Sequence, residues 1–193
     1  MSAPKRIVLG SGYMHIKTFK SGESIPEPQE FCSDDNLYSY ISGGATLTYS
    51  AEVQTASDDM GKVSKTSITS EEATLKAGLM TLNGNTLAKL CDTARVTVST
   101  DKKYRTVKIG GIGNRKGEKF VLCFHHPDPV DGDIWVMIVG QNQSGFELSF
   151  AKDDATVVDA EFKALPNLDN EGTLIEYVEA VSDANADTDT AST

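Results

Sequence analysis

The strongest constraint on the fold is an alternation of apolar and polar residues across residues 44–79. Alternation with a period of two is typical of strands that bury one face and leave the other in water. A polar loop, residues 58–64, divides the stretch into two arms. The small or apolar positions are Ala45, Leu47, Tyr49, Ala51 and Val53 in the first arm and Ala73, Leu75, Ala77 and Leu79 in the second. The sequence therefore predicts a long β-hairpin with an apolar, buried face and a polar face along water.

The rest of the chain predicts short strands and a single helix. Strands are expected at residues 13–19, 95–100, 104–112, 120–125, 134–139, 145–150, 156–165 and 173–181, and a long loop at 20–36. Segments 120–125 and 134–139, the second of which contains Trp135, are apolar on both sides, which favours central strands covered on both faces. In segment 156–165, Val158, Ala160, Phe162 and Ala164 should point inward. A helix is expected at 83–94, capped by Asn83 or Asn85.

These elements indicate a mainly β protein, a β-sandwich or barrel-like fold with one flanking α-helix. The glycine-rich segment 110–117 does not open a helix, so a hairpin turn is favoured over a phosphate-binding loop. With 193 residues, we expect one domain at 1–181 with an N-terminal arm at 1–12. Residues 182–193 are too polar to pack, and we expect a disordered acidic tail.

Charge and cysteine content narrow the function. The net charge of −10 disfavours nucleic-acid binding. Residues 1–119 contain 16 basic and 13 acidic side chains, whereas residues 120–193 contain 2 and 15, so copies could attract one another head to tail; solvated charge on both halves is an equally good interpretation. Three widely spaced cysteines indicate free thiols rather than a disulfide framework. Because no signal peptide and no apolar run long enough for a membrane span is evident, we expect a soluble protein made in the cytoplasm.

Residue patterns for catalysis or metal binding are weak. Cys123 and His125 alternate onto one face of a strand, but no second ligand pair stands at a zinc spacing. Asp128, Asp131 and Asp133 depart from the calcium-loop pattern and favour an acidic turn. The Asp153/Asp154 pair is more typical of a solvated surface than of acid–base chemistry. With no nucleophile elbow either, we expect no enzyme, no metal and no cofactor.

Three features taken together resemble a known family. The long hairpin with its loop at 58–64 is followed directly by a single helix at 85–94. The chain then closes with Phe146-Glu147-Leu148-Ser149-Phe150, Ala160-Glu161-Phe162-Lys163-Ala164-Leu165, Asp169 and Gly172-Thr173-Leu174-Ile175. This pattern, over about residues 10–181, resembles phage tail tube proteins, the major tail proteins of long non-contractile tails, in which a strand ending Phe-x-Ala leads through an Asp/Gly turn into a final strand.

The resemblance implies a structural virion protein whose hexameric rings stack into the tube that conducts phage DNA from capsid to host cell. It implies partners as well: other copies of the chain, and the tail terminator, tape measure and distal tail proteins. DNA would pass without specific binding, no membrane would be involved, and the protein would be located in the virion tail after assembly in the host bacterial cytoplasm. The tube of a contractile injection machine, or a β-sandwich binding or virion decoration module, is the alternative.

Within such a tube, we expect polar side chains of the hairpin to face the lumen, because a wall that binds phosphate would stall DNA. The expected lumen residues are Thr46, Thr48, Ser50, Glu52, Gln54, Glu72 and Thr74, with Asp159 and Glu161 as weaker candidates. Stacking and subunit contacts are expected at Asp58, Asp59, Lys62, Lys102, Lys103 and Arg105, and also in the loop at 22–36 and the N-terminal arm.

Overall fold

The computed structural model of the chain describes residues 8, 10–148, 150, 152, 155–167 and 170–181. The fold is mainly β, as predicted. The strands of the described part are β1 (Tyr13–Phe19), β2 (Leu37–Ser57), β3 (Ser64–Leu79), β4 (Arg95–Val98), β5 (Arg105–Lys108), β6 (Lys119–His126), β7 (Ile134–Asn142), β8 (Val158–Ala164) and β9 (Glu176–Glu179). Its helices are α1 (Pro28–Phe31), α2 (Gly84–Lys89) and the 3₁₀ turns η1 (Asp34–Asn36) and η2 (Ile112–Asn114).

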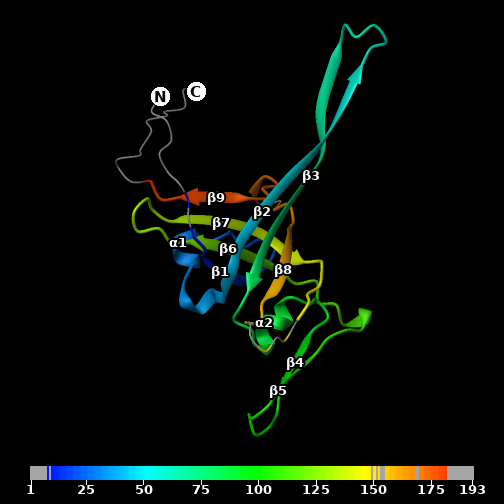
Figure 1. The fold of residues 1–193 in the computed structure, drawn as a ribbon. Helices are drawn as coiled ribbons and strands as arrows, with labels where there is room; N and C mark the ends of the chain where they lie inside the picture. Colours follow the sequence, from blue (N-terminus) through cyan, green and yellow to red (C-terminus); the bar gives the residue numbers. More distant parts are fainter. Residues whose placement is uncertain are drawn as a thin grey trace.

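Six antiparallel strands form a closed barrel (Figure 1). The pairing order is β6-β1-β2-β3-β8-β7, and β7 pairs back onto β6. β7 divides its other edge between two strands, because residues 134–137 pair with β9 and residues 140–142 pair with β8. β4 and β5 form a separate two-stranded sheet that extends from the barrel.

β2 turns a corner of the barrel at two glycines. Its first residues pair with β1 up to Tyr40, and its later residues pair only with β3 among the described strands. Between Ser42 and Ala45 the register skips Gly43 and Gly44, whose φ angles are 78° and 82°. Residues that carry a side chain rarely adopt this left-handed backbone conformation. The two glycines therefore allow the strand to bend as it leaves β1.

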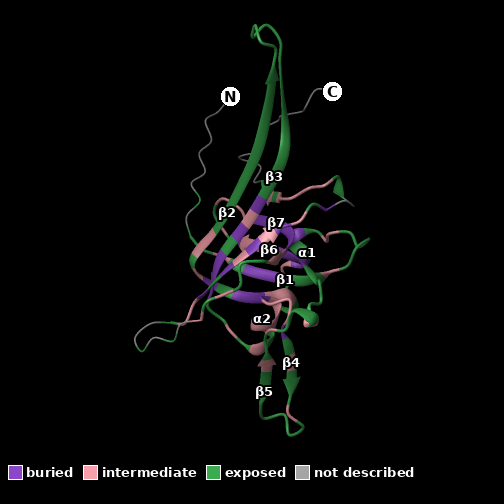
Figure 2. Cartoon of the chain, turned by 90° about the vertical axis from the view of Figure 1, so that its right-hand side faces the viewer, coloured by how far each residue is buried: buried purple, intermediate pink, exposed green. Residues whose placement is uncertain are grey.

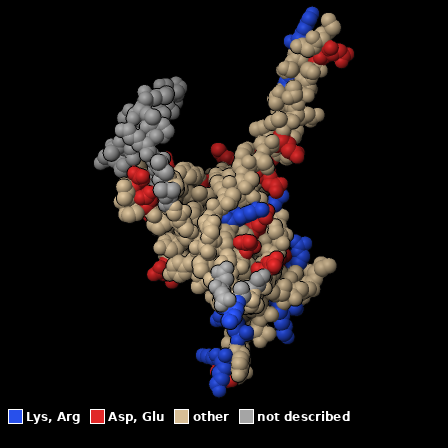
Figure 3. Space-filling view, viewed as in Figure 1, with Lys and Arg blue, Asp and Glu red and all other residues tan. Residues whose placement is uncertain are grey.

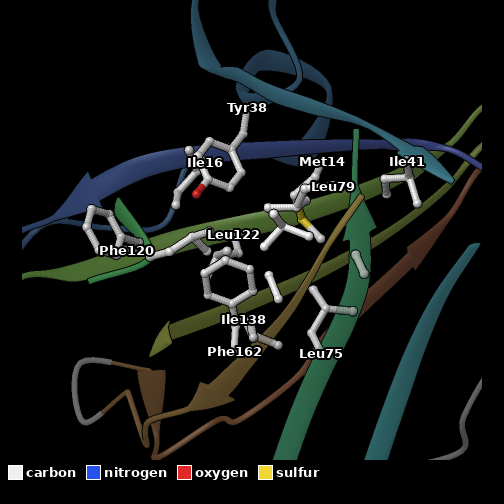
Figure 4. Close-up of a cluster of buried hydrophobic side chains, with 14 of the residues drawn as sticks. Met14, Ile16, Tyr38, Ile41, Leu75, Leu79, Phe120, Leu122, Ile138 and Phe162 are labelled. Carbon is white, nitrogen blue, oxygen red and sulfur yellow. The ribbon is translucent and has the colours of Figure 1, made fainter. Parts of the chain in front are cut away.

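The barrel interior is the main hydrophobic core (Figure 4). Alternate residues of β3 and β8 point into it, which confirms the predicted inward positions of both segments. Phe162 is fully buried, and its ring meets that of Tyr38 edge-on at 6.5 Å between centroids. The Tyr38 hydroxyl donates to the Thr86 carbonyl oxygen at 2.7 Å, which ties α2 to the barrel, and burial raises the pKa of Tyr38.

A second hydrophobic cluster lies on the outer side of β6 and β7. Val121, Cys123, Trp135, Met137 and Val139 form it, and Phe31 of α1 covers it. Trp135 is only 6% exposed, so its predicted place in the core is confirmed. Both faces of β6 and β7 are therefore covered, as the apolar runs predicted.

The predicted helix at 83–94 is too long. Asn83 is its N-cap, because its side-chain oxygen accepts from the amides of Asn85 and Thr86, but the α-helix ends at Lys89. Asp92 then binds elsewhere: its carboxylate accepts from the amides of Lys116 and Gly117. This attachment to the segment before β6 draws the chain out of the helical path.

Other boundaries also differ from the predictions. The segment 110–117 is not a hairpin turn, because β5 pairs only with β4 and the glycines, together with η2, connect that small sheet to β6. Residues 145–148 form no strand, the strand at 173–181 shrinks to β9, and the loop at 20–36 contains α1 and η1. The predicted tail at 182–193, and all of the N-terminal arm except residues 8 and 10–12, lie outside the described residues.

Candidate functional site

The candidate site is the part of the β2–β3 hairpin that leaves the barrel, here called the ribbon (residues 46–72). β3 pairs with β8 as far as Thr74. Beyond that level, β2 and β3 pair only with each other among the described strands. Every residue of the ribbon is exposed, and Figure 2 shows the projecting part green along its length. An isolated two-stranded ribbon is marginally stable in water, so this part of the chain is suited to being covered by another surface.

One face of the hairpin is polar and continues onto β8. Thr46 pairs with Lys76, Thr48 with Thr74, and Ser50 with Glu72. Paired residues on neighbouring strands lie side by side on the same face. With Asp159 and Glu161 of β8 alongside β3, this polar face brings together eight of the predicted lumen residues: Thr46, Thr48, Ser50, Glu52, Glu72, Thr74, Asp159 and Glu161. Gln54 lies past a bulge between Glu52 and Val53 and pairs with Ser67.

Two lysines balance part of the acidic charge on the polar face. Lys76 Nζ lies 2.7 Å from Glu161 Oε2, and Lys163 Nζ lies 3.0 Å from Glu72 Oε2. The Ser70 hydroxyl donates to Glu52 Oε2 at 2.9 Å. Exposed ion pairs of this kind add at most about 1 kcal/mol of stability. Their main effect is to satisfy carboxylates and ammonium groups within the face, which lowers its tendency to bind outside charges. Sequence alternation marked Lys76 and Lys163 as outward-pointing, but it could not pair them with Glu161 and Glu72.

The opposite face of the ribbon is mostly apolar and exposed, although it also carries Glu71, whose carboxylate accepts from the Tyr49 hydroxyl. Leu47, Tyr49, Val53 and Ile68 are 38%, 51%, 63% and 60% exposed. The prediction that this side of the hairpin is buried is correct only at its base, where Ala73, Leu75, Ala77 and Leu79 fill the barrel. It is wrong for the ribbon, because β8 ends its pairing at Thr74. Past that level the segment 171–175 only borders an open groove with Tyr49 and Glu71, and the ribbon residues stay exposed.

The tip of the ribbon is a closed turn held by Asp58. Its carboxylate accepts from the Val63 amide at 2.8 Å, and its carbonyl oxygen accepts from the Gly61 amide at 3.0 Å. The hydrogen bond from Val63 lowers the pKa of Asp58. Of the predicted contact residues at this end, Asp58 therefore orders the turn, whereas Asp59 and Lys62 are exposed on it.

Three other predicted contact residues lie at the other end of the molecule (Figures 1 and 3). Lys102, Lys103 and Arg105 are exposed on the β4–β5 hairpin, where Figure 3 shows a basic tip. Asp101 holds this turn by accepting from the Ser99 hydroxyl and the Lys103 amide, and the Ser99 hydrogen bond lowers its pKa. The structure thus separates the two predicted groups of contact residues instead of bringing them together in one chain.

Titratable groups elsewhere are mostly engaged in local structure. His125 Nε2 lies 2.8 Å from Asp133 Oδ2, and its ring stacks on Trp135. In the acidic turn, the carboxylates of Asp128 and Asp133 accept backbone amides of the turn itself. Asp153 and Asp154 lie outside the described residues. Within the described chain, no three or more His, Cys, Asp or Glu side chains are grouped so as to hold a metal ion.

An open groove of about 630 Å³ lies at the base of the polar face, between the bend at Gly43 and Gly44 and the segment that contains Phe146 and Glu147. Lys76 and Glu161, which line it, are already paired. In the described part of the chain, no helix has the length and apolar character needed to span a bilayer. A scan against protein-family models and a search of curated proteins found no match to this sequence.

Proposed function

We propose that this chain is a tail tube protein, which assembles as hexameric rings stacked into the tube that conducts phage DNA from capsid to host cell. The observation that supports the proposal best is the ribbon, which presents one apolar and one polar face and buries neither. An exposed apolar face of this kind marks a surface suited to burial against another molecule.

A second copy of the chain is a suitable cover. Leu47, Tyr49, Val53 and Ile68 would gain burial against a neighbour, and each fully buried aliphatic or aromatic side chain stabilises by about 1.5–3 kcal/mol. Residues 41–57 of β2 also leave one strand edge without a partner strand in the described chain. Such edges tend to pair with other chains, and a closed ring of copies satisfies all of them at once.

The polar face would then line the lumen. It combines hydroxyls with carboxylates, some of which are neutralised by Lys76 and Lys163. DNA binding depends mainly on cationic side chains that release counterions from phosphate. Because Lys76 and Lys163 are already paired, the wall around them offers little to hold DNA, which suits a conduit that must let DNA pass. Lys65, opposite Ala56 near the tip, is a further cation on this face.

The experiment is negative-stain electron microscopy of the purified protein over a range of concentrations, with sedimentation velocity on the same samples. We expect rings with six subunits and tubes built from stacked rings. A monomer at every concentration would contradict the proposal. A complex formed only with other virion proteins would instead favour a decoration module.

A further inference from the structure

Two thiols lie side by side on the outer face of the barrel. Cys32 Sγ, directly after α1, is 3.4 Å from Cys123 Sγ in β6, although the residues are 91 positions apart in sequence. Both belong to the second hydrophobic cluster, where Cys123 is fully buried and Cys32 is partly exposed. Cys32 is therefore the more accessible residue of the pair.

Two histidines, His15 and His125, lie near this pair. His15 is the β1 partner of Cys123 in the strand register, and it is 4% exposed. Its Nδ1 is buried and has no hydrogen-bond partner among the described residues. Its ring lies 6.2 Å from that of His125. The hydrogen bond with Cys123 and the nearby His15 imidazole lower the pKa of Cys32, against the opposing effect of burial. The contact with Cys32, together with burial, raises the pKa of Cys123. Cys32 is thus the nucleophilic member of the pair.

The two cysteines differ in their freedom to move. Cys123 is held in β6 between β1 and β7. Cys32 lies in the connection between β1 and β2, where its amide donates to the Pro28 carbonyl oxygen and no strand pairing restrains it. A disulfide needs the sulfurs at about 2.0 Å. The remaining approach is short, and a shift of the connection near Cys32 can supply it.

We propose that Cys32 and Cys123 are a redox-active dithiol that a low-molecular-weight disulfide of the glutathione class converts into an intramolecular disulfide. The Cys32 thiolate attacks one sulfur of the small disulfide, whose S–S bond breaks and releases one small thiolate. The Cys123 thiol gives its proton to that thiolate, and its sulfur attacks Cys32 Sγ and expels the second small thiolate, which takes up the proton that Cys32 lost on ionising. Two protein thiols are oxidised, and one small disulfide is reduced to two thiols.

The disulfide would fasten the connection at 20–36 to the barrel. That connection contributes Ile25 and Phe31, which pack over Val121, Trp135 and Met137. In the reduced protein, this cover is held to the barrel by side-chain packing. Within the connection itself, the Asn36 side chain donates to the Phe31 carbonyl oxygen. Oxidation would add a covalent bond between this connection and the barrel, which it otherwise contacts only by packing. This inference does not depend on the proposed function, because it concerns the single folded chain.

The test incubates the native, reduced protein with glutathione disulfide and counts free thiols by alkylation under non-reducing conditions. The chain has three free thiols, and we expect the count to fall by two. Intact mass should show the loss of two hydrogen atoms, and peptide mapping should identify a Cys32–Cys123 link. Three remaining thiols in the native protein, or a lasting glutathione adduct on wild-type Cys32, would overturn the proposal.

Cysteine variants test which thiol attacks the small disulfide and which thiol completes the intramolecular bond. After incubation with glutathione disulfide, the Cys32→Ser variant should keep its two remaining thiols. The Cys123→Ala variant should retain one glutathione bound to Cys32 through a mixed disulfide. Cys91→Ser is the matched control, since Cys91 lies outside the pair, and it should still lose two thiols. Loss of the reaction in Cys91→Ser, or its persistence in Cys32→Ser, would refute the assignment. Because Cys123 is buried and its variant could fail to fold, Cys32→Ser and Cys91→Ser decide the matter without it.

A physical readout completes the test. Oxidation of wild type and of Cys91→Ser should raise the thermal midpoint by roughly 5–10 °C and slow amide exchange in residues 20–36, whereas Cys32→Ser should show neither change. An unchanged midpoint and exchange rate in oxidised wild type would rule out the fastening. Protection of the reduced thiols from alkylation by added Zn²⁺ would assign a metal site instead and would also overturn the proposal.

Discussion

Single aspartates hold the turns of this chain. Asp58 closes the tip of the ribbon, Asp101 closes the β4–β5 turn, and Asp133 binds the Asp128 amide at 2.9 Å. Each accepts at least one backbone N–H, and a hydrogen bond to the ionised carboxylate favours that form. The pKa of all three is lowered accordingly. The turns therefore depend on a charge as well as on a backbone conformation.

Asp133 gives a testable pH dependence. The Asp128 amide, and then His125, lower its pKa in the folded state. Stability from the ionised carboxylate is thus complete above its unfolded pKa of about 3.9 and is lost as pH falls through the lower folded value. Asp133→Asn should cost roughly 0.5–1 kcal/mol at pH 7, since the side chain is 34% exposed and partly screened. The cost should shrink towards pH 3.

Urea unfolding at both pH values measures this difference. Asp131→Asn, in the same turn, is the control, and its effect should not change with pH in the same way. An equal cost of Asp133→Asn at pH 7 and pH 3 would show that the charge of Asp133 does not stabilise the fold.

At the scale of elements, the β2–β3 hairpin has two structurally different parts, a buried base and an exposed ribbon. Its base, from Ala73 to Leu79 in β3, is part of the barrel core. Its ribbon leaves the barrel at Thr74 and exposes both faces. The base is held by contacts within the chain. The ribbon has few such contacts, so anything that covers it would be another molecule.

Substitutions on the apolar face of the ribbon should separate folding from assembly. In Val53→Ser with Ile68→Ser, both altered side chains are at least 60% exposed, so the free energy of unfolding should change by less than about 0.5 kcal/mol. If these side chains are buried between copies, the concentration needed for assembly should rise by at least about tenfold.

Sedimentation velocity and electron microscopy provide the measurements, with urea unfolding as the test of folding. Thr48→Ala with Ser50→Ala, on the polar face, is the matched control and should assemble as wild type. Tubes that form from the serine variant at the wild-type concentration would place the contact elsewhere.

Much of the hairpin and of the core could be predicted, because alternation in sequence reports which side of a strand is buried. It predicted the burial of Leu75 and Phe162 and grouped Thr48 with Glu72 on one face. It could not predict that β8 stops pairing at Thr74, since this depends on strands distant in sequence, and so the exposure of Val53 and Ile68 was missed. The same limit applies to the binding of Asp92 to the amides near Gly117, which ends α2 early, and to the contact of Cys32 with Cys123.

For the whole molecule, the two hairpins end at opposite ends: the ribbon tip carries both basic and acidic side chains, whereas the β4–β5 tip is mainly basic (Figure 3). The β4–β5 end is basic, through Lys102, Lys103 and Arg105, although the chain has a net charge of −10. If rings stack by bringing this end to an acidic surface of the next ring, the attraction acts between copies and weakens with salt.

Charge reversal at that end should uncouple stacking from ring formation. Lys102→Glu with Lys103→Glu should leave a folded chain that forms rings but few tubes, because like charges would then meet. Lys17→Glu with Lys20→Glu changes the net charge equally on exposed residues of another region and should leave tubes intact. Tube lengths in electron micrographs at low and high salt provide the measurement. Normal tubes from the Lys102/Lys103 variant would exclude this end from stacking.

Closure of the barrel below the ribbon has a consequence for how the sequence can vary. Strand pairing around the barrel is complete without residues 50–57 and 64–72 of the ribbon, which pair only with each other in the described chain. If the ribbon packs against neighbouring molecules, its natural variation should be limited by that fit more than by the folding of the barrel. If the neighbours are identical copies, one gene encodes both the ribbon and the surface that receives it. A mutation in that gene then appears in every copy of the assembly. The ribbon should then diverge in step with the surface that receives it, while the barrel interior changes slowly.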